Sequence, residues 1–268
     1  MQRCAFSFSI LLDLTVMAAS DTSTIIGRNP VREALAREDQ GIEKVMLQQG
    51  ATGEAIGTIR KAAKSRGIPV QYVPEARLNH ESQGAVHQGV VAIASPITYD
   101  TVHELLTRVA PTWGDVQERK PLLLVIDRVT DTRNFGAILR SAVAAGVDGV
   151  IVPQTSMAPL NAAAIKASAG TATRIPIARA QDLPTVLQQL KERGYWVCGA
   201  EGTAEKTVWD VDFDRAVAVV LGSEGEGLAP DVAEACDVLA SIPMRGPAES
   251  LNVSVAAGVF LLNAARFR

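Results

Sequence analysis

The stretch "PLLLVIDRVTDTRNFGAILRSAVAAGVDGVIVP", residues 121–153, determines the expected fold of the second half of the chain. Its first residues, "PLLLVID", form an unbroken apolar run, which is typical of a strand covered on both faces. A helix is expected from Asn134 to Gly146, and "GVIVP" is the next strand. Strands and helices keep alternating to the end of the chain, which predicts an α/β fold with a mostly parallel sheet and helices on both faces.

Two further segments precede this stretch. Residues 23–96 alternate short apolar strands with helical patterns and predict a separate small α/β domain, whose first helix is expected to have Asn29 as its N-cap and Pro30 at the first helical position. The pattern weakens over residues 97–119, which we interpret as an interdomain linker with a helical piece. The second domain is then expected to cover residues 120–268.

The first 22 residues are separate from these domains. Arg3 and the apolar stretch after it resemble a weak signal peptide, but Asp13 interrupts that stretch. We therefore expect residues 1–22 to be a disordered or mispredicted extension. No other segment reaches the ~18 apolar residues that a membrane span requires, and we expect a cytoplasmic protein with no membrane partner.

The composition excludes several kinds of site. A formal net charge of −3 gives no global basic field, and an aromatic content of 4% argues against stacking platforms for single strands, so any RNA contact needs a local patch. The three cysteines are scattered and odd in number, as is typical of reduced thiols in the cytosol. They form no metal-ligand spacing with the three histidines, so no metal site is expected.

Ligands of such sheets bind beyond the carboxyl ends of the strands, and three strand ends are distinctive here. The first is "DRVTDTRNFGAILRSA", residues 127–142, where Asn134 stands at a helix start and Arg140 follows nearly two turns later. One substrate lying over this helix would touch both residues. The alternative is structural: Asn134 caps the helix, and Arg140 pairs with Asp131 or Asp127.

The second strand end is "VVLGSEGEGLAP", residues 219–230. Its three glycines let the backbone approach a ligand closely, but their G-x-x-G-x-G spacing matches neither the dinucleotide fingerprint nor a P-loop. Glu224 and Glu226 would repel a pyrophosphate. A neutral or cationic ligand with a ribose and an adenine therefore fits this loop better.

The third strand end is "IPMRGPAESLNVSVAAG", residues 242–258. Ser250 or Asn252 is expected to cap the last helix, which is predicted from Asn252 to Phe267. One cap requires one such residue, whereas Glu249 and Ser254 crowd into the same place. The surplus of polar side chains indicates a functional role as well.

Together the three stretches resemble the motifs of the SpoU/TrmH family, within the SPOUT class of RNA methyltransferases. The matching residues are Asp127, Asp131, Asn134, Gly136 and Arg140, then "GSEGEG" at 222–227, then "IPM" followed by "ESLNVSVA". Thr132 stands where the family usually has proline. "GRNPVREAL" and "GAVHQGVVA" are similar to the small L30e-like substrate-binding domain that precedes the catalytic domain in many members.

The resemblance implies a catalytic domain with a deep trefoil knot, S-adenosylmethionine as cofactor, and a homodimer whose partner subunit completes the site. The implied reaction is methylation of a ribose 2′-hydroxyl, most closely that of a guanosine in 23S ribosomal RNA. The residues with implied catalytic roles are Arg140, Asn134, Glu224, Ser250 and Asn252. The residues implied to bind the cofactor are Gly222, Ile242, Met244, Leu251 and Ser250.

In this resemblance Arg140 is either the base or the group that stabilises the developing alkoxide, and Glu224 is expected to orient it. The expected RNA contacts are Arg28, Arg32, His87, Gln88 and Arg128, with a structured turn as the alternative role of His87 and Gln88. A transfer-RNA ribose methyltransferase, a non-catalytic ribosome-assembly factor and a nucleotide-dependent oxidoreductase remain as alternatives.

Overall fold

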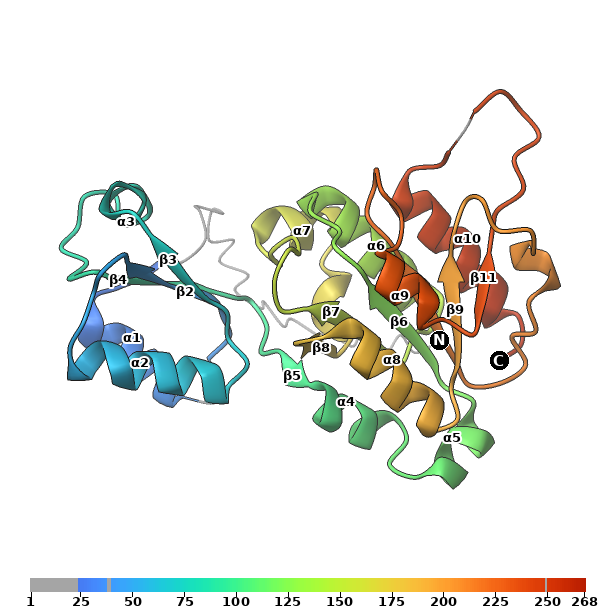
Figure 1. The fold of residues 1–268 in the computed structure, drawn as a ribbon, viewed down its shortest axis with the longest axis horizontal. Helices are drawn as coiled ribbons and strands as arrows, with labels where there is room; N and C mark the ends of the chain where they lie inside the picture. Colours follow the sequence, from blue (N-terminus) through green and yellow to red (C-terminus); the bar gives the residue numbers. More distant parts are fainter. Residues whose placement is uncertain (1–23, 38–39, 249) are drawn as a thin grey trace, which may run out of the picture.

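The computed structural model describes residues 24–37, 40–248 and 250–268, which form two α/β units (Figure 1). The expected extension at residues 1–22 lies outside the described residues, and so does Glu249 of the third strand end.

The N-terminal unit is a four-stranded mixed sheet in the order β1-β4-β2-β3. Alternate residues of β2 point to opposite faces: Val45 and Leu47 pack with α1 and α2, whereas Met46 packs with Leu78 of α3. Its elements are β1 (Thr24–Ile26), α1 (Arg28–Ala36), β2 (Ile42–Gln48), α2 (Glu54–Ser65), β3 (Val70–Val73), α3 (Glu75–Glu81) and β4 (Val90–Ala94). This is the small α/β domain expected from the sequence.

The start of α1 differs from the expectation. The N-cap is Gly27, with φ of 97° and no side-chain cap, so Pro30 is the third helical residue and Asn29 lies inside the first turn. The prediction of Asn29 as N-cap is wrong because the positive φ of Gly27 turns the chain into the helix two residues earlier.

The C-terminal unit is a seven-stranded parallel sheet in the order β11-β9-β10-β6-β7-β8-β5. Its strands are β5 (Asp100–Thr101), β6 (Leu122–Ile126), β7 (Gly149–Pro153), β8 (Ile177–Ala180), β9 (Trp196–Ala200), β10 (Val217–Leu221) and β11 (Val238–Ala240). Its helices are α4 (Val102–Val109), α5 (Trp113–Arg119), α6 (Thr132–Ala144), α7 (Ala162–Ala167), α8 (Leu183–Glu192), α9 (Pro230–Glu234) and α10 (Val253–Ala265).

Both faces of this sheet are buried, as its unbroken apolar strands predict. In β6, Leu122, Leu124 and Ile126 pack in the cluster that contains α6, α7 and α10. Leu123 and Val125 face the other way, into the cluster that contains α4, α5, α8 and α9. The expectation of a parallel sheet with helices on both faces is confirmed.

The linker expected over residues 97–119 is wrong for most of its length. β5 pairs with β8 at the edge of the large sheet, and α4 buries Leu105 and Leu106 against it. Gly149 of β7 shows how closely α4 packs, because an added Cβ would lie 2.7 Å from a Leu105 methyl group. Residues 100–119 therefore belong to the C-terminal unit.

A buried cluster joins the two units. Arg179 of β8 forms a 2.8 Å ion pair with Glu43 of β2, and its guanidinium carbon lies 3.6 Å from the centre of the Tyr99 ring. The Tyr99 hydroxyl donates a 2.8 Å hydrogen bond to Glu43, and burial raises the pKa of Tyr99. These contacts orient the N-terminal unit against the large sheet.

Three further properties of the described residues concern the expectations about thiols, metals and membranes. Burial raises the pKa of both the Cys198 and the Cys236 thiol to about 12, so neither is a thiolate at neutral pH. Within the described ranges, no three or more His, Cys, Asp or Glu side chains are grouped to hold a metal ion. No helix in the same ranges is long and apolar enough to cross a membrane.

Candidate functional site

A cavity of about 300 Å³ opens at the carboxyl ends of β9, β10 and β11, which are neighbours in the large sheet. The loops after β10 and β11 both line it, as does the start of α10. All five residues that the resemblance assigns to the cofactor lie in its wall: Gly222, Ile242, Met244, Ser250 and Leu251. The second and third strand ends therefore form one cavity.

The loop "GSEGEG" closes on itself just above β10. Ser223 and Gly227 form a two-way backbone pair, with N–H to O distances of 2.9 and 3.3 Å. Gly222 lies so near this closure that an added Cβ would be 2.1 Å from the carbonyl carbon of Gly227. The tight loop needs a glycine at 222 because there is no room for a side chain.

A chain of hydrogen bonds connects all three strand ends. Asn134 Nδ2 donates to Glu224 Oε1 at 3.0 Å, and Asn252 Nδ2 donates to Asn134 Oδ1 at 3.0 Å. The Glu224 carboxylate only accepts, which determines the direction of every later bond. Asn252 Oδ1 is then left to accept from Ser254 N at 2.8 Å, which makes Asn252 the N-cap of α10. Asn252 thus both caps the helix and joins the motifs.

The double role of Asn252 is separable by substitution. Asn252→Ser keeps a capping oxygen but cannot reach Asn134, so we expect stability to change by only a few tenths of a kcal/mol while turnover falls about tenfold. Asn252→Ala loses the cap as well and should cost about 1 kcal/mol more of stability. Thermal unfolding and initial rates of methyl transfer measure the two effects. Equal turnover of Asn252→Ser and the unchanged protein would show that Asn252 is only a cap.

At the first strand end, Asn134 does not cap the helix as the structural alternative assumed. Asp131, not Asn134, is the N-cap of α6, and its Oδ1 accepts from the backbone of Arg133 and Asn134 at 2.8 Å. The side chain of Asn134 is thereby left for Glu224 and Asn252. Gly136 serves packing, since an added Cβ would lie 2.3 Å from the carbonyl oxygen of Ala164 in α7.

Arg140 lies away from this network. Six helical residues turn the side-chain direction by about 600° and advance it by about 9 Å, so Arg140 and Asn134 face different sides of α6. Arg140 is exposed and has no hydrogen-bond or ion-pair partner among the described residues. Glu224 Oε1 is bonded to Asn134, and the expectation that Glu224 orients Arg140 stays a prediction.

Arg128, expected to contact RNA, is occupied within the protein. Its Nε donates to the buried Asp127 at 3.1 Å, and its Nη1 donates to Glu226 at 3.0 Å. Asp127 in turn accepts from the backbone of Ala229 at 2.8 Å. Arg128 thus ties the "GSEGEG" loop to the end of β6, and its phosphate contact stays a prediction.

The remaining expected RNA contacts lie in the N-terminal unit. Arg28 and Arg32 are one turn apart on α1, half-buried and exposed respectively. Gln88 is exposed, whereas His87 is buried and has both ring nitrogens bonded, to Asn79 Oδ1 and to the backbone N–H of Gly89, each at 3.0 Å. The structure therefore gives His87 the alternative role of holding its turn.

The sequence-based reasoning missed one wall of the cavity. Ala200 at the end of β9 lines this wall, with Glu201 and Gly202 directly after it. Ala256 and Phe260 of α10 line the cavity as well. The apolar run at 195–200 is the sequence signal for β9, and the end of that strand points to Glu201. With Glu224 and Glu226, Glu201 makes the lining acidic, and none of its described residues is basic.

Known proteins match both units. The family model described as SpoU rRNA Methylase matches residues 121–262, and that described as RNA 2′-O ribose methyltransferase substrate binding matches residues 24–100. The chain is 39% identical over 244 residues to the 23S rRNA (guanosine-2′-O-)-methyltransferase RlmB of Xylella fastidiosa, spanning 91% of this chain and 96% of that protein. The enzyme of the same name from Escherichia coli is 37% identical over 91% of this chain and 98% of its own.

A solved structure has the same architecture. The AdoMet-bound rRNA methyltransferase from Sinorhizobium meliloti aligns with a TM-score of 0.56 and 26% identity, over 91% of this chain and 86% of that one. The match extends over both α/β units. With its three motifs around one acidic cavity and its matched N-terminal unit, the chain belongs to the SpoU rRNA Methylase family of RNA 2′-O-ribose methyltransferases.

Proposed function

We propose that this protein transfers a methyl group from S-adenosylmethionine to the ribose 2′-hydroxyl of a guanosine in 23S ribosomal RNA. The observation that carries the proposal is the acidic, glycine-bordered cavity joined by hydrogen bonds to Asn134. The substrate follows the relatives of this chain, which share its full two-domain length and are named for that reaction.

The residues of the cavity fit this cofactor. Leu251, Ile242 and Phe260 supply apolar surface for an adenine, and the closed loop at Gly222 presents backbone groups to a ligand. The three glutamates favour a cationic ligand over a pyrophosphate, which argues against the oxidoreductase alternative. S-adenosylmethionine supplies a methyl group on a positively charged sulfur.

The side chains of this protein supply orientation and charge. Asn134 is held by Glu224 and Asn252, so its position is fixed before a substrate arrives, which is the condition for orienting a reacting hydroxyl. Arg140 brings a positive charge that stabilises the alkoxide developing on the ribose oxygen, while an RNA phosphate or a neighbouring group takes the hydroxyl proton.

Methylation mapping tests this function directly. The full chain is incubated with S-adenosylmethionine and unmodified 23S ribosomal RNA, and 2′-O-methylation is mapped by resistance of the backbone to alkali. We expect a single modified guanosine ribose. Methylation of transfer RNA alone, or of a base instead of a ribose, would contradict the proposal. Calorimetry gives an independent test, because a methyltransferase should bind S-adenosylmethionine and a nucleotide-dependent oxidoreductase should bind NAD.

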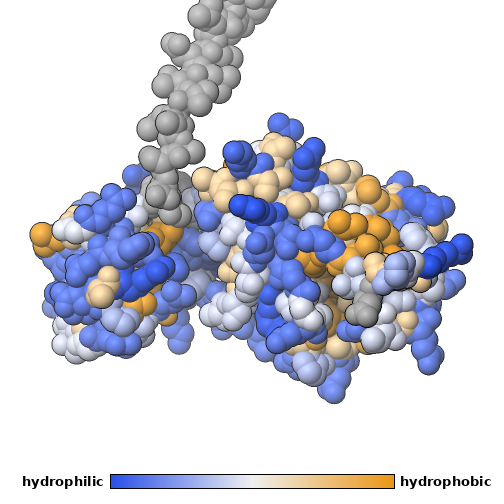
Figure 2. Space-filling view, turned by 90° about the horizontal axis from the view of Figure 1, so that it is seen from above, coloured by the Kyte–Doolittle hydropathy of each residue, from blue (hydrophilic) through white to orange (hydrophobic). Residues whose placement is uncertain are grey.

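We also propose that the protein acts as a homodimer in which α10 faces the partner. Val255 and Leu262 of α10 are exposed by 51% and 53% although the helix also has a buried apolar side. Val255 and Leu262 border one surface hollow together with Trp209 and Val259. Figure 2 shows an apolar area on the larger, C-terminal unit. Such an area is typical of a subunit interface. Arg140 lies on α6, which packs against α10, so this interface would bring Arg140 of the partner subunit near the cavity. The trefoil knot is a separate prediction from the resemblance.

Leu262→Glu is expected to abolish the dimer, because it places a charge in the apolar interface. Sedimentation should show a monomer at concentrations at which the unchanged protein is dimeric, and methyl transfer should fall with it. Gln189→Glu, on the exposed face of α8, adds the same charge on the opposite layer and should stay dimeric. A dimeric Leu262→Glu variant would place the interface elsewhere.

A further inference from the structure

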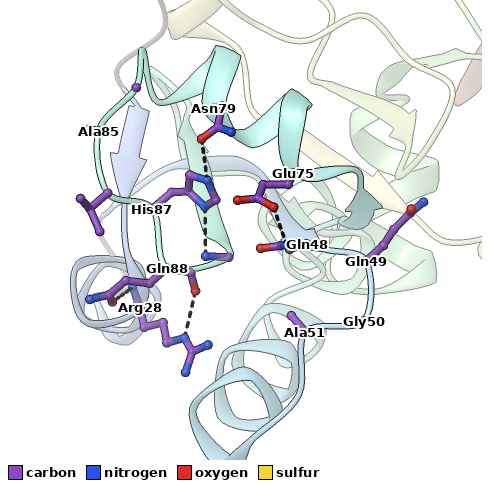
Figure 3. Close-up of a pocket in the computed structure, with 13 residues that line it drawn as sticks. Arg28, Gln48, Gln49, Gly50, Ala51, Glu75, Asn79, Ala85, His87 and Gln88 are labelled. Carbon is purple, nitrogen blue, oxygen red and sulfur yellow. Dashed lines mark hydrogen bonds between the residues drawn. The ribbon is translucent and has the colours of Figure 1, made fainter.

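A second recess, of about 530 Å³, lies in the N-terminal unit, apart from the cavity at the sheet edge (Figure 3). It opens between residues 84–89 before β4, residues 48–51 after β2, and the start of α1. Nothing in the proposed methyl-transfer chemistry uses it. Its size is that of a pocket for a small molecule or a single nucleotide.

The loop on one side of the recess is rigid and strained. Gln83 and Gln88 have φ of 51° and 52°, a conformation that residues other than glycine rarely adopt. The buried His87 holds the loop through its hydrogen bonds to Asn79 and Gly89, shown as dashed lines in Figure 3. Strained backbone that the surroundings hold in place is characteristic of ligand sites.

Opposite charges face the recess from its two sides. Arg28 donates through Nε to the Gln88 carbonyl at 3.0 Å, and its two Nη groups have no partner among the described residues. Across the recess, Glu75 accepts from Gln48 Nε2 at 3.3 Å through Oε2, which leaves Oε1 available within the described structure. Figure 3 shows Arg28 and Glu75 on different walls, and no ion pair joins them.

We propose that this recess binds one unpaired guanosine of the RNA substrate, separate from the nucleotide that is methylated. Arg28 contacts its phosphate, and Glu75 accepts hydrogen bonds from the edge of its base. Among the four bases, guanine alone presents two adjacent N–H donors, N1–H and N2–H, to the oxygens of one carboxylate. Adenine and cytosine place a ring acceptor next to the amino group, and uracil flanks its single N–H with carbonyl oxygens.

RNA is the partner that the domain supports, because the family model matching residues 24–100 describes RNA methyltransferase substrate binding. Sequence-specific recognition of RNA takes place mainly at unpaired nucleotides whose base edges are accessible. This inference rests on the proposed function for its partner, but not on the identity of the methylated nucleotide.

Binding of RNA hairpins that differ only in one bulged nucleotide tests the inference. Fluorescence anisotropy with the full chain should show the guanosine bulge bound about tenfold more tightly than an adenosine bulge or a fully paired hairpin. Glu75→Gln should remove the preference for guanosine over adenosine. Glu54→Gln is the matched control, since Glu54 is also the exposed first residue of a helix in this domain and lies outside the recess.

Arg28→Ala should weaken binding of all bulged hairpins equally and lower the salt dependence, as expected for a phosphate contact. Calorimetry should give the same affinity for S-adenosylmethionine in every variant. Equal binding of guanosine and adenosine bulges by the unchanged protein, or an unaltered preference in Glu75→Gln, would overturn the inference. Failure of the unchanged protein to methylate ribose would instead overturn the proposed function and leave the bulge preference intact.

Discussion

Arg140→Ala is expected to lower the turnover of methyl transfer by about 10²-fold or more, with unchanged affinity for S-adenosylmethionine. The guanidinium is exposed and makes no hydrogen bond or ion pair within the described part of its own chain, so its removal should leave folding intact. It does not line the cavity, which should keep cofactor binding intact as well. Single-turnover rates and calorimetry on the same preparation measure the two properties.

Arg193→Ala is the control for this result. Arg193 is the C-cap residue of α8, and α8 packs on the opposite face of the sheet from α6. Its replacement removes the same charge far from the cavity and should keep full turnover. If Arg140→Ala were as active as Arg193→Ala, Arg140 would have no part in the reaction.

Gly222→Ala is expected to weaken binding of S-adenosylmethionine about 100-fold, which corresponds to about 2.7 kcal/mol. The added methyl would lie 2.1–2.3 Å from backbone atoms of Gly227 and Leu228, and backbone cannot move aside as a flexible side chain can. The closed loop must therefore open. Overpacking of this kind also costs about 1–3 kcal/mol of stability, which thermal unfolding would show as a lower Tm.

Gly225→Ala is the matched control in the same loop. No protein atom lies within 4 Å of the position that its Cβ would take, so the substitution should leave Tm close to that of the unchanged protein. If Gly222→Ala bound S-adenosylmethionine normally, the loop would not form the cofactor site.

The two substitutions together test whether Arg140 acts across the dimer. In a mixed dimer of Arg140→Ala and Gly222→Ala subunits, one cavity retains Gly222 and faces the intact Arg140 of the partner subunit. Random mixing should then restore about a quarter of the full activity. If Arg140 served its own chain, neither site would be complete and the mixture would stay inactive.

Much of the fold could be predicted because it depends on local patterns. The apolar run before Asp127 and its repeats along the chain identified the buried parallel strands, since burial on both faces leaves few polar positions. The acidic loop with Glu224 indicated from charge alone that the ligand is neutral or cationic. Five cofactor positions assigned by resemblance line a single cavity, although their binding roles remain proposals.

The differences between the sequence-based expectations and the structure share one cause. The partner of a side chain depends on segments that lie elsewhere in the sequence. Residues 100–119 were interpreted as a linker because their polar residues dominate locally, yet Leu105 and Leu106 find a sheet to pack on. The guanidinium of Arg128 bonds to Glu226, 98 positions later in the chain, a partner that the sequence did not indicate. Asn134 was considered as a cap, and Asp131 took that role.

By itself, the sequence of this protein determined most of the strands and helices outside residues 100–119, that two α/β units follow one another, and which loops carry reactive groups. These properties follow from hydrophobic periodicity and from residue chemistry, which act over a few neighbouring positions. Only the tertiary structure decided that Glu224, Asn134 and Asn252 form one chain of hydrogen bonds while Arg140 faces elsewhere. Hydrogen bonds act over about 3 Å, so packing has to bring residues 90 and 118 positions apart within that reach before their partners are determined.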